Sequence, residues 1–164
     1  MAKITFSLDT HLPAEAVVAA AIDFTEKRLH YWPNIDPKVY KVHSTTSTTA
    51  YVTEGSAMLG GIWAREAYDW SQPGNVLATV QESNAFQPGG KWHLHATPLV
   101  DGGCRVEVLS NRVARGLKGR AIGTMLTLFG ARVMRAQLQQ TLDIIAKDMA
   151  LGPTAKVGAR VETM

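Results

Sequence analysis

The sequence predicts one α+β domain in which a curved antiparallel sheet of seven strands holds a long C-terminal helix. Three observations lead to this prediction. A strand-like segment opens the chain, short strand-like runs separated by turn signals fill its middle, and a long segment with helical periodicity follows. A lone sheet must bury one face, and only the long helix is large enough to cover it. We therefore expect the sheet and this helix to enclose an interior cavity.

The N-terminal part of the chain predicts one strand and two short helices. Apolar and polar residues alternate over about 3–9, as in a half-buried strand. Pro13 stands at the start of an alanine-rich segment and favours the first turn of a helix. A second short helix is expected to begin near Thr25 and to end before Pro33.

The middle of the chain predicts an antiparallel meander. Short β-branched and aromatic runs alternate with loop signals such as Gln72-Pro73-Gly74-Asn75, at a spacing typical of consecutive hairpins. Six strands are expected at about 39–45, 49–57, 61–71, 75–86, 90–99 and 103–113.

The last element is predicted to be a helix from about Leu117 to Ala150. Its apolar residues recur every three or four positions, and we expect Leu126, Phe129 and Val133 to pack on the sheet. At ~1.5 Å per residue, the helix is long enough to cross a whole sheet. The tail over 151–164 has no apolar period, so we expect it to be disordered.

The composition of the chain argues against disulfides, metal sites and bound cofactors. The chain has 164 residues and one cysteine, Cys104, which excludes an internal disulfide and a cysteine-built zinc site. His93 and His95 could form half of a metal site, but no third ligand is visible, so no metal is expected. No phosphate-binding loop is present either, and no cofactor is expected.

The sequence also predicts where the protein is found and which kinds of partner it can bind. No run approaches the roughly 18 apolar residues of a membrane span, and the N-terminus lacks the apolar core of a signal peptide, so we expect a cytoplasmic protein without integral membrane contact. The net charge is +3, and the stretch 112–135 is basic and has no acidic residue. An anionic surface or an acidic partner could bind at Arg112, Arg115, Lys118 and Arg120, although a solvated face is the alternative. No aromatic residue lies between these four basic residues for base stacking, so nucleic acid is not expected.

Three motifs, together with the order of the elements, resemble the START-like (SRPBCC) superfamily, in particular its polyketide cyclase/dehydrase and lipid-transport branch. The motifs are Tyr31-Trp32-Pro33-Asn34-Ile35, Gly61-Ile62-Trp63-Ala64-Arg65 and the segment 102–108. The resemblance implies a helix-grip fold, with residues 1–150 as a single ligand-binding domain. It also implies a small hydrophobic ligand, because the family includes carriers, receptors and enzymes for such molecules.

Strand register predicts a candidate catalytic cluster. If the loop at 72–75 joins two hairpin strands, Arg65 faces Glu82, and a turn at 59–60 brings Glu54 to the other side of Arg65. The more apolar face of these strands should be the covered one, which places the three side chains in the cavity. An arginine between two carboxylates could leave one of them protonated as a general acid. The alternative is an exposed row of ion pairs on the open face.

The predicted cavity wall is mostly apolar. The last hairpin leaves two registers open, because a three-residue loop at 101–103 turns Trp92 inward and a two-residue loop turns His93 and His95 inward; the apolar pattern favours the first. The candidate ligand-binding residues are Trp32, Trp63, Val80, Asn84, Trp92, Val108, Ser110, Phe129 and Val133.

Three functions are compatible with these features. The first is binding or carrying of a small lipid- or polyketide-like molecule in the cavity. The second is an enzyme similar to polyketide cyclases and dehydratases, which guide aldol cyclisation and water loss. Trp32 matches an aromatic position of those enzymes, whereas Arg65 is displaced from their central-strand arginine, where Asp69 stands. The third is a protein-interaction module that uses the basic stretch 112–135.

Overall fold

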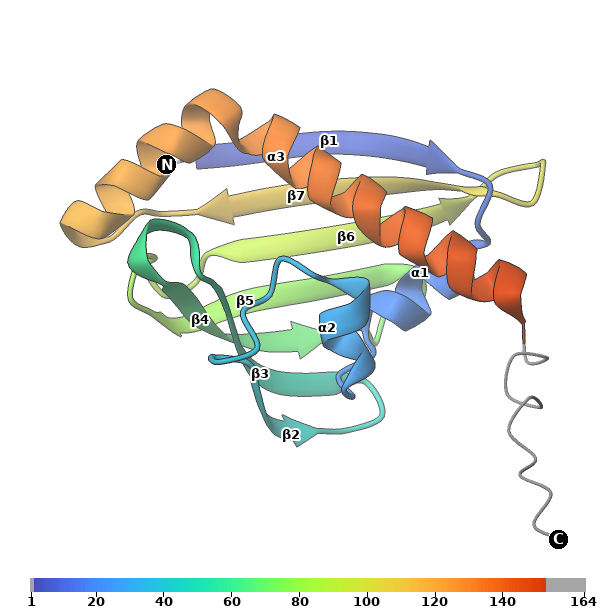
Figure 1. The fold of residues 1–164 in the computed structure, drawn as a ribbon, viewed down its shortest axis with the longest axis horizontal. Coiled ribbons are helices and arrows are strands. Elements are labelled where there is room, and N and C mark those ends of the chain that lie inside the picture. The colour runs from blue at the N-terminus through green and yellow to red at the C-terminus, as the bar shows by residue number, and fades with distance from the viewer. Residues whose placement is uncertain (1, 153–164) are drawn as a thin grey trace, which may run out of the picture.

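The computed structural model describes residues 2–152, and the greater part of the tail predicted to be disordered, 153–164, lies outside the described residues. Seven antiparallel strands form one sheet, and a long helix lies across it (Figure 1). The strands are β1 (Ala2–Thr10), β2 (Lys41–Thr45), β3 (Thr49–Ser56), β4 (Ile62–Asp69), β5 (Asn75–Ser83), β6 (Lys91–Pro98) and β7 (Cys104–Arg112). The helices are α1 (Ala14–Ala21), α2 (Lys27–Tyr31), α3 (Gly116–Leu151) and the 3-10 turn η1 (Met58–Gly60).

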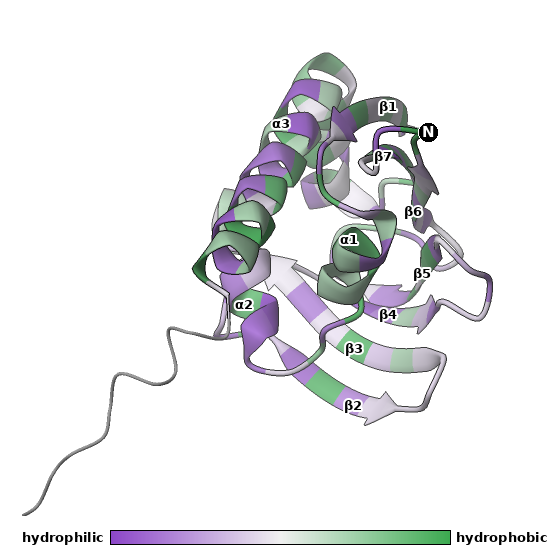
Figure 2. Ribbon diagram, turned by 90° about the vertical axis from the view of Figure 1, so that its right-hand side faces the viewer, coloured by the Kyte–Doolittle hydropathy of each residue, from purple (hydrophilic) through white to green (hydrophobic). Residues whose placement is uncertain are grey.

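The strand order is β1-β7-β6-β5-β4-β3-β2, so β2 to β7 form a meander and β1 joins its far edge. Helix α3 follows β7 and packs against β1, and its second half also contacts α1 and α2. All three helices lie on the same side of the curved sheet (Figure 2). The predicted seven-stranded helix-grip arrangement, with two short helices between the first and second strands, is confirmed.

The inner face of the sheet follows from the alternation of side chains along β5, β6 and β7. Val76 and Ala78 on β5, Leu94 on β6, and Val106 and Val108 on β7 are all buried. The last hairpin turns Trp92 inward, as the three-residue loop predicts, although the observed pairs, Trp92 with Ser110 and Leu94 with Val108, are shifted by two residues from a loop at 101–103. His93 and His95 therefore point to the outer face, where both rings hydrogen-bond the side-chain oxygen of Asn75.

The two halves of α3 contact the sheet differently. Leu138 and Leu142 in the second half are buried, whereas Phe129 in the first half is 57% exposed, so the prediction that Phe129 packs on the sheet is wrong. The contact face of the first half includes Gly130, where an added Cβ would lie 2.5 Å from Cδ1 of Ile4 on β1. Phe129, one residue earlier, is rotated by about 100° from this face and points to solvent.

Candidate ligand cavity

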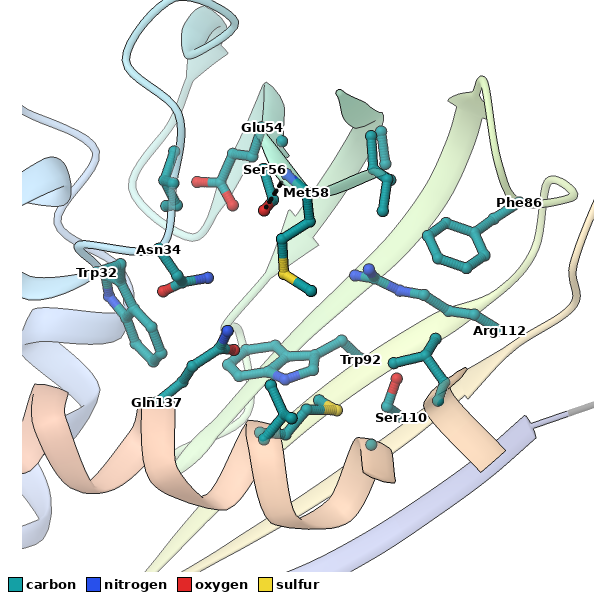
Figure 3. A pocket seen from close by; sticks show the side chains of 18 of the residues that line it. Trp32, Asn34, Glu54, Ser56, Met58, Phe86, Trp92, Ser110, Arg112 and Gln137 are labelled. Carbon is teal, nitrogen blue, oxygen red and sulfur yellow. Dashed lines mark hydrogen bonds between the residues drawn. The ribbon is translucent and has the colours of Figure 1, made fainter. Parts of the chain in front are cut away.

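A cavity of about 250 Å³ lies between the inner face of the sheet and α3, with residues of α2 and the loop after it at one end. Most side chains on its wall are apolar, and they include Phe6, Trp32, Trp92, Val108, Met125 and Met134 (Figure 3). The rings of Trp32 and Trp92 meet edge to face, with their centroids 6.0 Å apart. The wall thus combines aromatic rings and aliphatic side chains with flexible methionines, which can adapt to an apolar molecule.

The cavity opens to solvent between η1 and α3. Met58 on η1 is 40% exposed and Val133 on α3 is 36% exposed, although both line the cavity. Asn34 lines the cavity from the loop after α2 and is also exposed. These residues form a rim through which a small molecule can reach the interior.

The first polar cluster of the cavity centres on Arg28, which is only 3% exposed. Its Nε donates to Oε1 of Glu54 at 2.7 Å, and its Nη2 donates to Oε2 of the same carboxylate at 3.2 Å. Nη1 donates to the carbonyl of Ala21 at 2.7 Å, and Nη2 also reaches the hydroxyl of Tyr68 at 3.1 Å. Every nitrogen of this guanidinium has a protein partner, so the cluster fixes α2 to β3 and β4.

The second polar cluster is an ion pair between Glu66 and Arg112. Glu66 on β4 is 3% exposed, and its Oε1 accepts a hydrogen bond of 2.5 Å from Nη2 of Arg112 at the end of β7. The guanidinium lies 5.4 Å from the ring centroid of Phe86. Burial raises the pKa of Glu66, and the nearby Glu54 raises it further, while Arg112 opposes the shift. Glu66 therefore holds a proton more readily than an ordinary glutamate.

The structure places six of the nine candidate ligand-binding residues on the cavity wall: Trp32, Trp63, Trp92, Val108, Ser110 and Val133. The other three lie elsewhere. Val80 is buried in a separate small cluster with Ile122. Asn84 uses its amide to bond the backbone of Trp63 and Gly61, and Phe129 is exposed.

The predicted cluster of Arg65, Glu82 and Glu54 does not form. Arg65 does pair with Glu82, but its other neighbour is Thr53, and the side chains of Arg65 and Glu82 are 36% and 55% exposed. Only Glu54 lines the cavity, where it binds Arg28. Arg65 lies on the open face of the sheet, so the prediction of a buried Arg65 is wrong.

Two strand irregularities explain this error. The 3-10 turn η1 sets the register of β3 and β4 so that Ala64, and not Arg65, is opposite Glu54. A bulge between β4 and β5 then leaves Gln81 unpaired, because Arg65 faces Glu82 and Glu66 faces Val80. Residues two apart share a face in a regular strand, and the extra residue of the bulge removes this relation, so Val80 points inward and Glu82 outward.

Sequence reasoning did not identify Arg28, Glu66 or Tyr68. It counted Arg112 in a basic surface, although the favoured three-residue loop turns Arg112 to the same face as Trp92 and Ser110. The alternation along β7 was the available signal for Arg112, because this residue follows Val108 and Ser110 at steps of two. Glu66 shares the inner face of β4 with Ala64 and would have followed from the correct register.

The basic surface predicted at Arg112, Arg115, Lys118 and Arg120 is not supported. Arg112 points into the cavity, and Nζ of Lys118 donates to the carbonyls of Gly60 and Gly61. Only Arg115 and Arg120 remain exposed. Arg132 and Arg135, farther along the stretch 112–135, are exposed as well, and the interaction-module alternative stays a prediction.

The described residues hold neither a candidate metal site nor a candidate membrane-spanning helix. Within residues 2–152, no group of three or more histidine, cysteine, aspartate or glutamate side chains is placed to hold a metal ion. In the same part of the chain, no helix has the length and apolar content needed to cross a membrane.

Comparisons with known proteins place the fold. No family model and no curated protein sequence matches this chain. Among solved structures, the Zhui aromatase/cyclase from Streptomyces sp. R1128 superimposes with a TM-score of 0.76 at 12% identity, covering 90% of this chain and 94% of that one. A START superfamily protein from Mycobacterium smegmatis gives a TM-score of 0.72 at 11% identity, covering 88% and 97%. Norcoclaurine synthase from Thalictrum flavum gives 0.64 at 11%, covering 90% and 86%. The resemblance to START-like proteins is thus confirmed for the fold.

Proposed function

We propose that this protein binds or carries a small, mostly apolar molecule in the cavity between the sheet and α3. The observation that carries the proposal is the cavity of about 250 Å³ with a largely apolar wall. Its polar groups are confined to a few positions, as in ligand pockets that orient a molecule rather than solvate it. The solvent-facing rim at Met58 and Val133 provides access. The similarity in fold to START and aromatase/cyclase structures supports this function.

Binding of an uncharged, environment-sensitive dye such as Nile red tests the proposal. Ala64 lines the cavity from β4, so Ala64→Phe places a ring inside it and should abolish the fluorescence gain. Ala67 lies on the same strand but on the outer face, where it pairs with Thr79. Ala67→Phe is the matched control and should bind the dye like the parent. Equal binding by both variants would locate the dye on the surface and contradict the proposal.

The identity of a natural ligand can be sought by native mass spectrometry of the protein purified from its own host. An added mass that Ala64→Phe removes and Ala67→Phe retains would identify a cavity ligand. An added mass retained by both variants would come from another site.

A second candidate function is catalysis of an aldol cyclisation in the same cavity. The ion pair of Glu66 and Arg112 favours it, because it sets a carboxyl with a raised pKa beside a guanidinium at an apolar wall. Glu66 would deliver a proton to the carbonyl oxygen that becomes a hydroxyl and recover one from the carbon that forms the new bond. Loss of water would then remove that hydroxyl with a hydrogen from the adjacent carbon.

Turnover of a short linear poly-β-ketone thioester, followed by the absorbance of the aromatic product, distinguishes the two functions. An enzyme should lose turnover in Glu66→Gln while Nile red binding persists. A carrier should bind the dye and should not accelerate cyclisation above the rate without protein.

A further inference from the structure

The two arginines of the cavity differ in how many of their hydrogen-bond donors are used. A guanidinium has five N–H donors. Arg28 makes four hydrogen bonds, to Glu54, to Tyr68 and to the carbonyl of Ala21, so that each of its three nitrogens has a partner. Arg112 makes one hydrogen bond among the described residues, from Nη2 to Glu66, and its Nε is buried without a partner. Arg112 is therefore an incompletely satisfied cation on the wall of an apolar cavity.

From this difference, and on the basis of the function proposed above, we infer that the ligand is a small amphipathic acid. Its carboxylate or similar oxyanion is held by Arg112 and Ser110, and its binding is accompanied by uptake of one proton from solvent by Glu66.

The neighbours of Arg112 suit an oxygen-bearing group. Ser110 lies two residues earlier on β7, on the same inner face, and its hydroxyl has no hydrogen-bond partner among the described residues although the residue is only 6% exposed. Trp92 is paired with Ser110 across the strands and also lines the cavity. Figure 3 shows the Arg112 guanidinium pointing into the cavity, with Ser110 and Trp92 along the same wall. Donors without acceptors on one wall call for a ligand that supplies acceptors.

The charge balance explains why a proton should be taken up. Glu66 is faced by Arg112 from β7, by Glu54 from β3, by Arg28 from α2 and by Tyr68 on its own strand. Arg28 is bound to Glu54, so Arg112 is the cation available to Glu66. A ligand anion on Arg112 would place two anions on one guanidinium in a largely buried site, which is unfavourable. Protonation of Glu66 removes this repulsion and leaves the ligand anion paired with Arg112.

A matched pair of probes, octanoate and octan-1-ol, tests the inference by displacement of Nile red. Both have the same chain, and only octanoate carries an oxyanion. Arg112→Gln should weaken octanoate binding by about tenfold or more, since a hydrogen bond to a charged group is lost. It should change octan-1-ol binding much less. Equal weakening of both probes would show that Arg112 only shapes the cavity and would overturn the inference.

The double variant Arg112→Gln/Glu66→Gln guards against misfolding, because it leaves no buried unpaired charge. It should retain octan-1-ol binding and the weakened octanoate binding. If octan-1-ol binds the parent and octanoate does not, the inference fails while the proposed function stands. If neither probe nor Nile red binds the parent, the proposed function itself fails.

Calorimetry measures the proton directly. Octanoate is titrated into the parent protein at pH 7 in phosphate and in Tris buffer. The two binding enthalpies should differ by the number of protons taken up times the difference between the ionisation enthalpies of the two buffers. We expect the parent protein to take up protons on binding octanoate and the Glu66→Gln variant to take up none. The same enthalpy in both buffers for the parent would contradict the role assigned to Glu66.

Discussion

Arg28 and Glu54 form a two-point ion pair that joins α2 to the inner face of the sheet. Nε and Nη2 of Arg28 lie 2.7 and 3.2 Å from the two carboxylate oxygens of Glu54. The side chains are 4% and 12% exposed, so the pair is almost dry. The Arg28 guanidinium carbon also lies 4.8 Å from the ring centroid of Phe24. The geometry of the cavity's α2 end therefore depends on one arginine whose three nitrogens are all hydrogen-bonded.

Arg28→Met should destabilise the protein by about 3 to 5 kcal/mol, because it leaves the Glu54 carboxylate buried without its cation. Chemical denaturation with urea measures the free energy of unfolding. Adding Glu54→Gln to Arg28→Met should recover much of the loss, since the remaining charge is then removed and the amide can still accept from Tyr68.

Arg65→Met is the matched control on the open face. Its ion pair with Glu82 is substantially exposed, and such pairs contribute roughly 0 to 1 kcal/mol. Arg65→Met could instead lower the free energy of unfolding by several kcal/mol, or Arg28→Met could leave it unchanged. Either result would contradict the placement of Arg28 in the interior and of Arg65 on the open face.

The fold could be predicted because its signals are long and redundant. The turn sequences between strands and the apolar period of α3 each extend over many residues, so small errors in a boundary do not change the topology. The inner faces of β6 and β7 were also predictable, because one loop length turned Trp92, Leu94, Val106 and Val108 to the same side.

The polar site could not be predicted in the same way. A shift of one residue exchanges the two faces of a strand, and β4 has an irregular connection on each side. The η1 turn and the bulge at Gln81 together place Glu66 inside and Arg65 outside. Nothing in the composition of these strands marks a bulge, and both faces of β4 carry a charged residue. The sequence therefore predicted a catalytic cluster around Arg65, whereas the structure buries the carboxyl of Glu66.

Phe129→Ala should cost about 0.5 kcal/mol or less, since this side chain is 57% exposed. Leu138→Ala, on the same helix, should cost about 2 to 5 kcal/mol because Leu138 is 3% exposed in the core. Thermal and urea unfolding of both variants make the comparison. A larger loss from Phe129→Ala than from Leu138→Ala would show that α3 packs through a different face.

Gly119→Ala should destabilise the protein although alanine favours helices by roughly 1 kcal/mol over glycine. An added Cβ at this position would collide with the backbone carbonyl of Ala85, which also accepts a hydrogen bond of 2.8 Å from the amide of Arg115. This pinned backbone cannot easily move, and the expected net loss is about 1 to 3 kcal/mol by overpacking.

Gly123→Ala is the control for Gly119→Ala. Its new Cβ would lie 3.3 Å from the Cβ of Ala114, a milder contact with a side chain. We expect a smaller loss of melting temperature than in Gly119→Ala. Equal or higher stability of Gly119→Ala than of the parent would show that α3 can move away from Ala85.

Glu66 should make stability fall as pH rises from the acid range. Burial and the proximity of Glu54 raise the pKa of Glu66 above its ordinary 4.5. The folded state therefore binds more protons at this group than the unfolded state between the two pKa values, and the slope of unfolding free energy with pH is negative in that window. At a pH below the unfolded-state pKa, the neutral carboxyl of Glu66 contributes its full share to the free energy of unfolding. At a pH above the folded-state pKa, this contribution is lost.

The variant Glu66→Gln isolates this contribution, because glutamine keeps the shape of the side chain and cannot titrate. The difference in melting temperature, variant minus parent, should rise with pH across the window above 4.5 and level off once Glu66 is ionised in the folded parent. A difference for Glu66→Gln that falls with pH would mean that Arg112 stabilises the carboxylate more than burial opposes it. Glu66 would then be a permanent anion, and both the proton uptake and the general-acid role assigned to it would fail together.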